Sequence, residues 1–163
     1  MIAESSNIIN DNETVVRLIS SEWIEDGYLL DAAFALAPKE NYLSVLRPII
    51  STFKEDLCYL VELHEDFKYD ENHCQVASLN VNDVRSIKII NGSDVLNIDV
   101  VVEPRDKKLK SHAGIIVKSN DQYVINGRNL NDSIPKDISA DDILQEIQSD
   151  LREIAMLDKY PID

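Results

Sequence analysis

An alternating apolar pattern on both sides of an Asn-Gly pair constrains the fold of this chain more than any other feature. Residues 88–90 and 95–102 flank Asn91-Gly92, the pair favoured where both residues of a hairpin turn need positive φ. Within 95–102 every second residue from Leu96 onward is apolar, which is typical of an antiparallel strand with one buried face. The pattern therefore predicts a β-hairpin inside an antiparallel sheet.

Two amphipathic helices are predicted to cover that sheet. The first runs from Pro48 to Glu65 and the second from Ser139 to near Met156, because apolar residues recur every three or four positions in both. Since each helix has one apolar stripe, we expect both on one face of the sheet or at its ends. The stripes consist of Ile49, Phe53, Leu57 and Leu60 in the first helix and of Leu144, Ile147, Leu151 and Ile154 in the second.

The other segments complete an α+β fold, a single domain over residues 1–163 with a mainly antiparallel sheet. A chain of 163 residues with 44% hydrophobic content has enough apolar surface for one core. Further strands are expected around Arg17, Ser44, Val76, Ile115 and Val124. Three segments connect or flank these elements. They are a partly ordered lead-in at 1–12, a loop at 28–36 that ends in a short strand at 34–36, and a short tail at 159–161.

The charge balance restricts the classes of partner. With 30 acidic and 16 basic side chains the formal charge is -14, which repels nucleic acid phosphates and anionic membranes, so neither is a predicted partner. The acidic excess suits a soluble protein or one that docks on a basic protein partner. Two cysteines, Cys58 and Cys74, are too few for a disulfide framework. No signal peptide is visible and no apolar run approaches the about 20 residues that span a bilayer, so we expect a cytoplasmic protein.

Polar side chains on apolar segments mark the candidate ligand-binding residues: Arg17, Trp23, Ser44 and Arg47. A buried guanidinium needs a carboxylate, a set of carbonyls or a ligand anion. Alternatively, Arg17 is an ordinary exposed strand residue, or both arginines form structural ion pairs with Asp99 or Glu103. The lone tryptophan either plugs the edge of the core or lines a pocket.

His112 is a candidate catalytic acid or base. It shares a strand face with Gly114, which leaves room for a backbone or a ligand beside the imidazole. By contrast, His64, His73 and Cys74 lack the ligand spacing of zinc ribbons or fingers, so we predict no metal site and no cofactor. The sequence also lacks a Gly-rich phosphate loop and the His-Glu-x-x-His, Gly-x-Ser-x-Gly and Cys-x-x-Cys signatures.

Several of these short motifs resemble a family of small uncharacterised bacterial proteins. That family has an arginine-bearing first strand, a tryptophan and a glycine, an Ala-Phe pair, a Leu-Ser-Val-x-Arg strand and a late His-Ala strand. The resemblance implies a bacterial intracellular origin and points to no particular activity. The matching residues are Arg17, Trp23, Gly27, Ala33-Phe34, Leu43-Ser44-Val45 with Arg47, and His112-Ala113.

A second resemblance concerns the arginine of the first strand and the serine of a later one, which look like the dinucleotide-holding pair of ADP-ribosyltransferases. The chain departs from that family because it has no Glu-x-Glu or Gln-x-Glu pair on a late strand. Glu103 is then the only candidate for the catalytic glutamate.

Two functions from different classes follow. The one we expect is a noncatalytic acidic intracellular protein that binds another macromolecule, such as an accessory or immunity-type component of a toxin or defence system. The alternative is a small-molecule or nucleotide-binding enzyme, ADP-ribosyltransferase-like, that uses Arg17, Ser44, Arg47 and His112. Convergence of these four side chains on one cleft favours the alternative.

Overall fold

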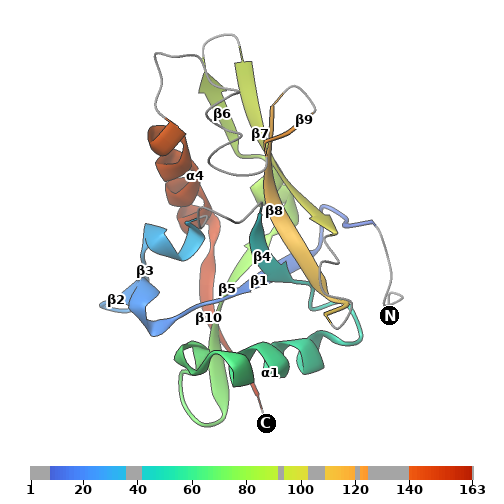
Figure 1. The fold of residues 1–163 in the computed structure, drawn as a ribbon, viewed down its shortest axis with the longest axis vertical. Helices are drawn as coiled ribbons and strands as arrows, with labels where there is room; N and C mark the ends of the chain where they lie inside the picture. The colour runs from blue at the N-terminus through green and yellow to red at the C-terminus, as the bar shows by residue number, and fades with distance from the viewer. Residues whose placement is uncertain are drawn as a thin grey trace.

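The computed structural model describes residues 8–35, 42–91, 94–102, 109–119, 122–124 and 140–162. They form one antiparallel sheet with helices packed against it, so the predicted α+β class is confirmed (Figure 1). The strands of this sheet are β1 (Thr14–Leu18), β4 (Leu43–Leu46), β5 (His73–Asn80), β6 (Lys88–Asn91), β7 (Asp94–Val102), β8 (His112–Ser119), β9 (Gln122–Val124) and β10 (Met156–Pro161). The helices are α1 (Phe53–Leu63), α2 (Val81–Arg85) and α4 (Ala140–Ile154), with 3₁₀ turns η1 (Ser21–Trp23), η2 (Asp31–Phe34) and η3 (Glu65–Phe67).

The strand order of the sheet is β10-β5-β1-β4-β8-β7-β6, and β9 pairs with β8. The predicted hairpin is present as β6 and β7 at one edge of the sheet, where Asn91 pairs with Asp94. In β7, Leu96, Ile98 and Val100 are buried, as their alternation predicts. A second, shorter hairpin joins β2 (Ile24–Glu25) to β3 (Tyr28–Leu29).

The two faces of the sheet carry separate apolar clusters. On one face, α4 contributes Ile143, Ile147 and Leu151 to the larger core. On the other, Leu57 and Val61 of α1 pack against neighbouring residues of the strands. The two helices therefore pack against different clusters, to which adjacent strand residues such as Val15 and Val16 contribute from opposite sides of the sheet. Of the two expected arrangements, one shared face or the ends of the sheet, the first is wrong. The second cluster includes Val16, Leu18, Leu46, Cys74 and Val76.

In the middle of the sheet, β1 and β4 are paired over fewer residues than any other two neighbouring strands. Val16 faces Leu46, and this is the single residue pair in register between the two strands. By comparison, β1 runs beside β5 over its whole length, from Thr14 opposite Asn80 to Leu18 opposite Val76. The backbones of β1 and β4 thus diverge on either side of one pair.

Three predicted boundaries need correction. Pro48 does not begin α1, because two turns come first, in which Ile50 N–H donates to Arg47 O and Phe53 N–H donates to Ile50 O. The strand expected at 34–36 is absent up to residue 35, because Ala33 and Ala35 N–H groups make 3₁₀ bonds to Leu30 and Ala32. The expected tail at 159–161 belongs to β10, which pairs with β5 from Met156 opposite Ser78 to Pro161 opposite His73.

Other expectations fall outside the described residues. They are residues 1–7 of the expected lead-in, Leu36, the start of the second helix at Ser139, and Glu103. Within the described chain, no helix has both the length and the apolar character needed to cross a lipid bilayer.

Candidate functional site

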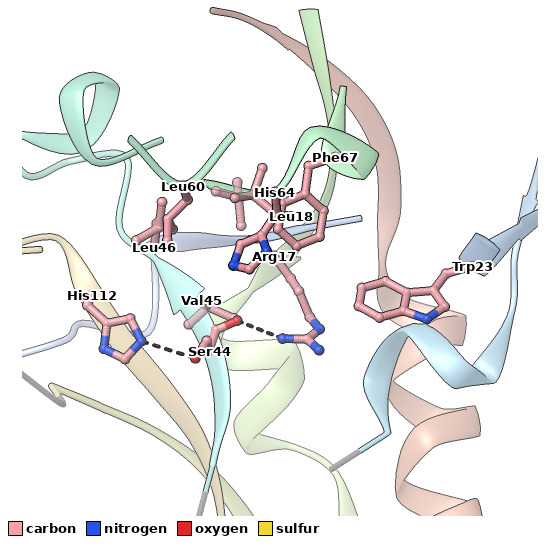
Figure 2. Close-up of a pocket in the computed structure, with 11 residues that line it drawn as sticks. Arg17, Leu18, Trp23, Ser44, Val45, Leu46, Leu60, His64, Phe67 and His112 are labelled. Atoms are coloured by element: carbon pink, nitrogen blue, oxygen red, sulfur yellow. Dashed lines mark hydrogen bonds between the residues drawn. The ribbon is translucent and has the colours of Figure 1, made fainter. Parts of the chain in front are cut away.

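A cavity of about 300 Å³ lies beside the point where β1 and β4 diverge (Figure 2). The strands supply its floor, the end of α1 and the turn η3 supply one wall, and η1 supplies Trp23 at another side. Three of the four candidate ligand-binding residues and His112 line this cavity together. The full lining is Val16, Arg17, Leu18, Trp23, Ser44, Val45, Leu46, Leu60, His64, Phe67 and His112.

Arg17 is held in the divergence between the two strands. Its Nε donates to Ala33 O over 2.6 Å and its Nη1 donates to Ser44 O over 3.0 Å. The guanidinium carbon also lies 5.4 Å from the ring centroid of Trp23, within the range of a cation–π contact. With 9% of its surface exposed, Arg17 is buried rather than an exposed strand residue, and carbonyls and an aromatic face are among its partners.

Ser44 and His112 meet across the pair β4–β8. Ser44 faces Gly114 and Leu46 faces His112 in register, so the serine and the histidine are diagonal neighbours on one face of the sheet. His112 Nε2 lies 3.2 Å from Ser44 Oγ. The imidazole is 7% exposed, whereas Ser44 is exposed in the cavity. The sequence singled out Ser44 and His112 on their strands but did not predict that they are in contact.

Tyr42 fixes the position of the imidazole. The rings of Tyr42 and His112 meet edge to face with centroids 5.5 Å apart. A Cβ on Gly114 would lie 2.9 Å from the Tyr42 ring, closer than side-chain packing allows. The room that Gly114 was expected to leave beside His112 is therefore filled by Tyr42, in part because glycine has no side chain to hold it away.

The residue before His112 is anchored to α1 by a buried carboxylate. Asp56 accepts hydrogen bonds from Ser111 Oγ at 2.6 Å and Ser111 N–H at 3.0 Å, and from Thr52 Oγ1 at 3.1 Å. Arg47 N–H in turn donates to Ser111 O. Asp56 was missed by sequence analysis, because an aspartate in the first turn of a helix ordinarily reads as a solvent-facing residue that favours the helix dipole.

Arg47 does not reach the cavity and belongs to a separate, buried ion pair. Its Nε and Nη2 each donate to one carboxylate oxygen of Glu13 over 2.9 Å, and Nη2 also donates to Ile8 O. The arginine is 1% and the glutamate 4% exposed. Arg47 is thus in a structural ion pair, as one alternative held, although its partner is Glu13 instead of Asp99 or Glu103.

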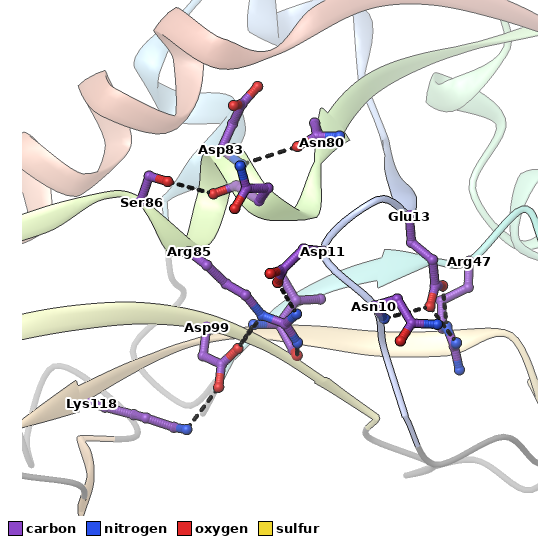
Figure 3. A network of polar contacts seen from close by, with 12 residues as sticks. Asn10, Asp11, Glu13, Arg47, Asn80, Asp83, Arg85, Ser86, Asp99 and Lys118 are labelled. Atoms are coloured by element: carbon purple, nitrogen blue, oxygen red, sulfur yellow. Dashed lines mark hydrogen bonds and ion pairs between the residues drawn. The ribbon is translucent and has the colours of Figure 1, made fainter.

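Asp99 lies in a second polar network, drawn with the first in Figure 3. It accepts from Arg85 Nε at 2.8 Å and from Lys118 Nζ at 2.7 Å, and Arg85 also reaches Asp11. Burial alone would raise the pKa of Asp99, but the hydrogen bonds from Lys118, Arg85 and Val100 N–H outweigh it, and the pKa lies below its ordinary value. Arg85 and Lys118 are therefore committed to this network, and neither is among the described lining residues of the cavity.

The charge of the cavity differs from that of the whole chain. Arg17, His64 and His112 line it, and no aspartate or glutamate occurs among its described lining residues. The sequence offered His64 only as a candidate metal ligand, which its spacing argued against. Its place here as the residue that ends α1, with its ring 5.6 Å from that of Phe67, was not predicted. Nowhere in the described part of the chain do three or more His, Cys, Asp or Glu side chains gather closely enough to hold a metal ion.

The two cysteines differ in environment. Cys74 is buried in β5, and desolvation raises the pKa of its thiol to about 11. Cys58 on α1 is half-buried and donates to Ile162 O. Neither thiol lines the cavity.

Comparison with known proteins adds no relative: no family model, no curated protein and no solved structure matches this chain. The site is therefore interpreted from its own chemistry.

Proposed function

We propose that the cavity beside β1 and β4 binds a small molecule with an anionic group next to an apolar or aromatic part. The observation that carries the proposal is the convergence of Arg17, Ser44 and His112 on one cavity whose described lining has no carboxylate. In a chain with 30 acidic side chains, a concave site whose described lining has a guanidinium and no acidic side chain favours a negatively charged ligand.

The neighbours of Arg17 support the second half of the ligand description. Trp23 lies against the guanidinium, and Leu18 and Phe67 line the same cavity. Pockets for small molecules are mostly apolar with a few convergent polar groups, and their volumes run from about 300 to 1,000 Å³. A cavity of about 300 Å³ suits a compact ligand, such as an aromatic phosphate or carboxylate, or one end of a larger nucleotide.

The two functions expected from the sequence depend on other features of the chain than this proposal does. Binding of a basic macromolecular partner rests on net charge alone and stays a prediction. The ADP-ribosyltransferase-like alternative needs a glutamate near the arginine and the serine, and its only candidate, Glu103, is outside the described residues. Arg47 has no part in the proposed site, because it is bonded to Glu13.

A thermal-shift screen of anionic compounds tests the proposal. The panel contains inorganic phosphate, aromatic carboxylates, aromatic phosphates, nucleoside phosphates and NAD. A ligand at 100 times its dissociation constant adds about 2.7 kcal/mol to the free energy of unfolding. We expect a stabilising compound whose effect is lost in Arg17→Gln and kept in Arg152→Gln, a cation 39% exposed on α4.

A second variant guards against misfolding of Arg17→Gln. Leu60→Trp adds a large ring to a residue of the cavity wall and leaves the arginine and its partners unchanged. It should abolish the shift while its circular dichroism spectrum matches that of the unmodified protein. The proposal is wrong if no compound stabilises the protein at millimolar concentration, or if stabilisation persists in Leu60→Trp.

A further inference from the structure

We infer that Ser44 acts as a nucleophile and His112 as its general base, so that the cavity hydrolyses an ester with an anionic acyl group. The inference rests on the proposed ligand site and adds a reaction to it. An activated nucleophile is recognised by a hydroxyl and a base within hydrogen-bond reach, with the base held in turn by a third group.

The geometry of the pair meets these conditions. Ser44 Oγ is exposed in the cavity and lies 3.2 Å from His112 Nε2. The imidazole packs edge to face with the Tyr42 ring, and the preceding residue, Ser111, is fixed by Asp56. Both reacting groups stand on central strands of the sheet, which are rigid supports for a site.

Arg17 gives the pair its electrostatic setting. Its Nη1 donates to the backbone carbonyl of Ser44, so a positive charge lies beside the residue that would carry the acyl group (Figure 2). A carboxylate on the acyl part of the substrate is attracted to this charge. The same charge favours the oxyanion that forms when a hydroxyl adds to a carbonyl.

The reaction balances with water as the only co-reactant. Ser44 Oγ bonds to the ester carbonyl carbon while its proton passes to His112 Nε2. The bond from that carbon to the alcohol oxygen then breaks, and the alcohol leaves with the proton from the imidazolium. Water next adds to the acyl carbon and gives a proton to His112, the bond to Ser44 Oγ breaks, and Oγ recovers that proton as the acid departs.

Two reagents test the inference on the intact protein. An alkyl fluorophosphonate forms a phosphorus–oxygen bond to an activated serine with loss of fluoride, and the adduct is located by peptide mass mapping. 4-Nitrophenyl succinate supplies an anionic acyl group and releases 4-nitrophenol, which is compared with release from the uncharged 4-nitrophenyl acetate. We expect the adduct on Ser44. After the spontaneous release from each ester without protein is subtracted, we also expect a larger protein-dependent release from the succinate.

Matched variants separate a reactive pair from a structural hydrogen bond. Ser44→Ala should abolish labelling, and His112→Gln should slow it about 100-fold or more. Ser86→Ala, which removes a hydroxyl bonded to Asn82 O on α2, should label like the unmodified protein. A structural role for the contact predicts instead that Ser44 stays unlabelled in the unmodified protein, which would overturn the inference.

One further variant covers misfolding of His112→Gln. In Ser44→Cys the new thiol should be alkylated faster by anionic iodoacetate than by iodoacetamide, because Arg17 attracts the anion; the reverse order contradicts the inference. The inference also fails separately from the proposed function. Stabilising anions without labelling of Ser44 remove the reaction and leave the binding site, whereas the absence of both removes both.

Discussion

The two buried arginines, Arg17 in β1 and Arg47 just after β4, have different partners among the described residues. Arg17 uses backbone carbonyls and an indole ring, whereas Arg47 uses the carboxylate of Glu13. The guanidinium of Arg17 lies in the lining of the cavity, whereas that of Arg47 is hydrogen-bonded to a carboxylate away from it. This contrast decides which of the two arginines can serve a ligand.

Removal of one member of the buried pair should be strongly destabilising. In Glu13→Gln the side chain keeps its shape but Arg47 loses its counter-charge at a position 1% exposed. We expect the free energy of unfolding to fall by about 3 to 5 kcal/mol, as measured by urea denaturation. Asp11→Asn removes an exposed partner of Arg85 and should cost about 1 kcal/mol or less; similar losses in the two variants would contradict the prediction.

Because the pKa of Asp99 is lowered, we predict how its contribution to the free energy of unfolding depends on pH. Because the folded-state pKa lies below the unfolded value, ionised Asp99 stabilises the protein above about pH 4, and this contribution is lost as the pH falls through the folded-state pKa. Asp99→Asn should therefore lower the free energy of unfolding by about 1 to 3 kcal/mol at pH 7. The difference from the unmodified protein should shrink at pH 3, and a difference that stays constant with pH would refute the assignment.

At the scale of elements, Tyr42, the residue before β4, packs on Gly114 of β8, and we predict the effect of disturbing this contact. Gly114→Ala places a methyl group 2.9 Å from the ring of Tyr42, so the ring must move and its contact with His112 is lost. We expect a loss of about 1 to 3 kcal/mol in unfolding free energy. In a double-mutant cycle with Tyr42→Ala the combined loss should be smaller than the sum of the two; simple additivity would show that the clash is not the cause.

Sequence patterns predicted elements whose signals are local. The hairpin of β6 and β7 carries its own turn residues, and the stripes of α1 and α4 show which side each helix buries. The strand β10 was missed because its pairing partner is about 80 positions away in β5, and no short window records that contact. The hairpin after Trp23 was also missed, although its Asp26-Gly27 turn, with φ of 53° and 83°, is a favoured pair for such turns.

At the scale of the whole molecule, the candidate site depends on topology more than on any motif. Arg17, Ser44 and His112 were singled out because polar groups on apolar segments need partners. Their convergence requires β4 to lie between β1 and β8, which the sequence did not indicate. For the same reason Arg47 was grouped with them, since the position of Glu13 beside it follows from the fold and not from spacing along the chain.

The single residue pair between β1 and β4 has a mechanical consequence. It divides the sheet into two ladders, β10-β5-β1 and β4-β8-β7-β6, joined at a short rung. The guanidinium of Arg17 spans this joint, because its own strand is β1 and one of its acceptors is in β4. A load that draws the ladders apart falls on this backbone pair, on Arg17 and on the ion pair between Glu13 before β1 and Arg47 after β4. The joint should therefore yield before either ladder does. The cavity is lined from both ladders, so the proposed ligand would brace the joint.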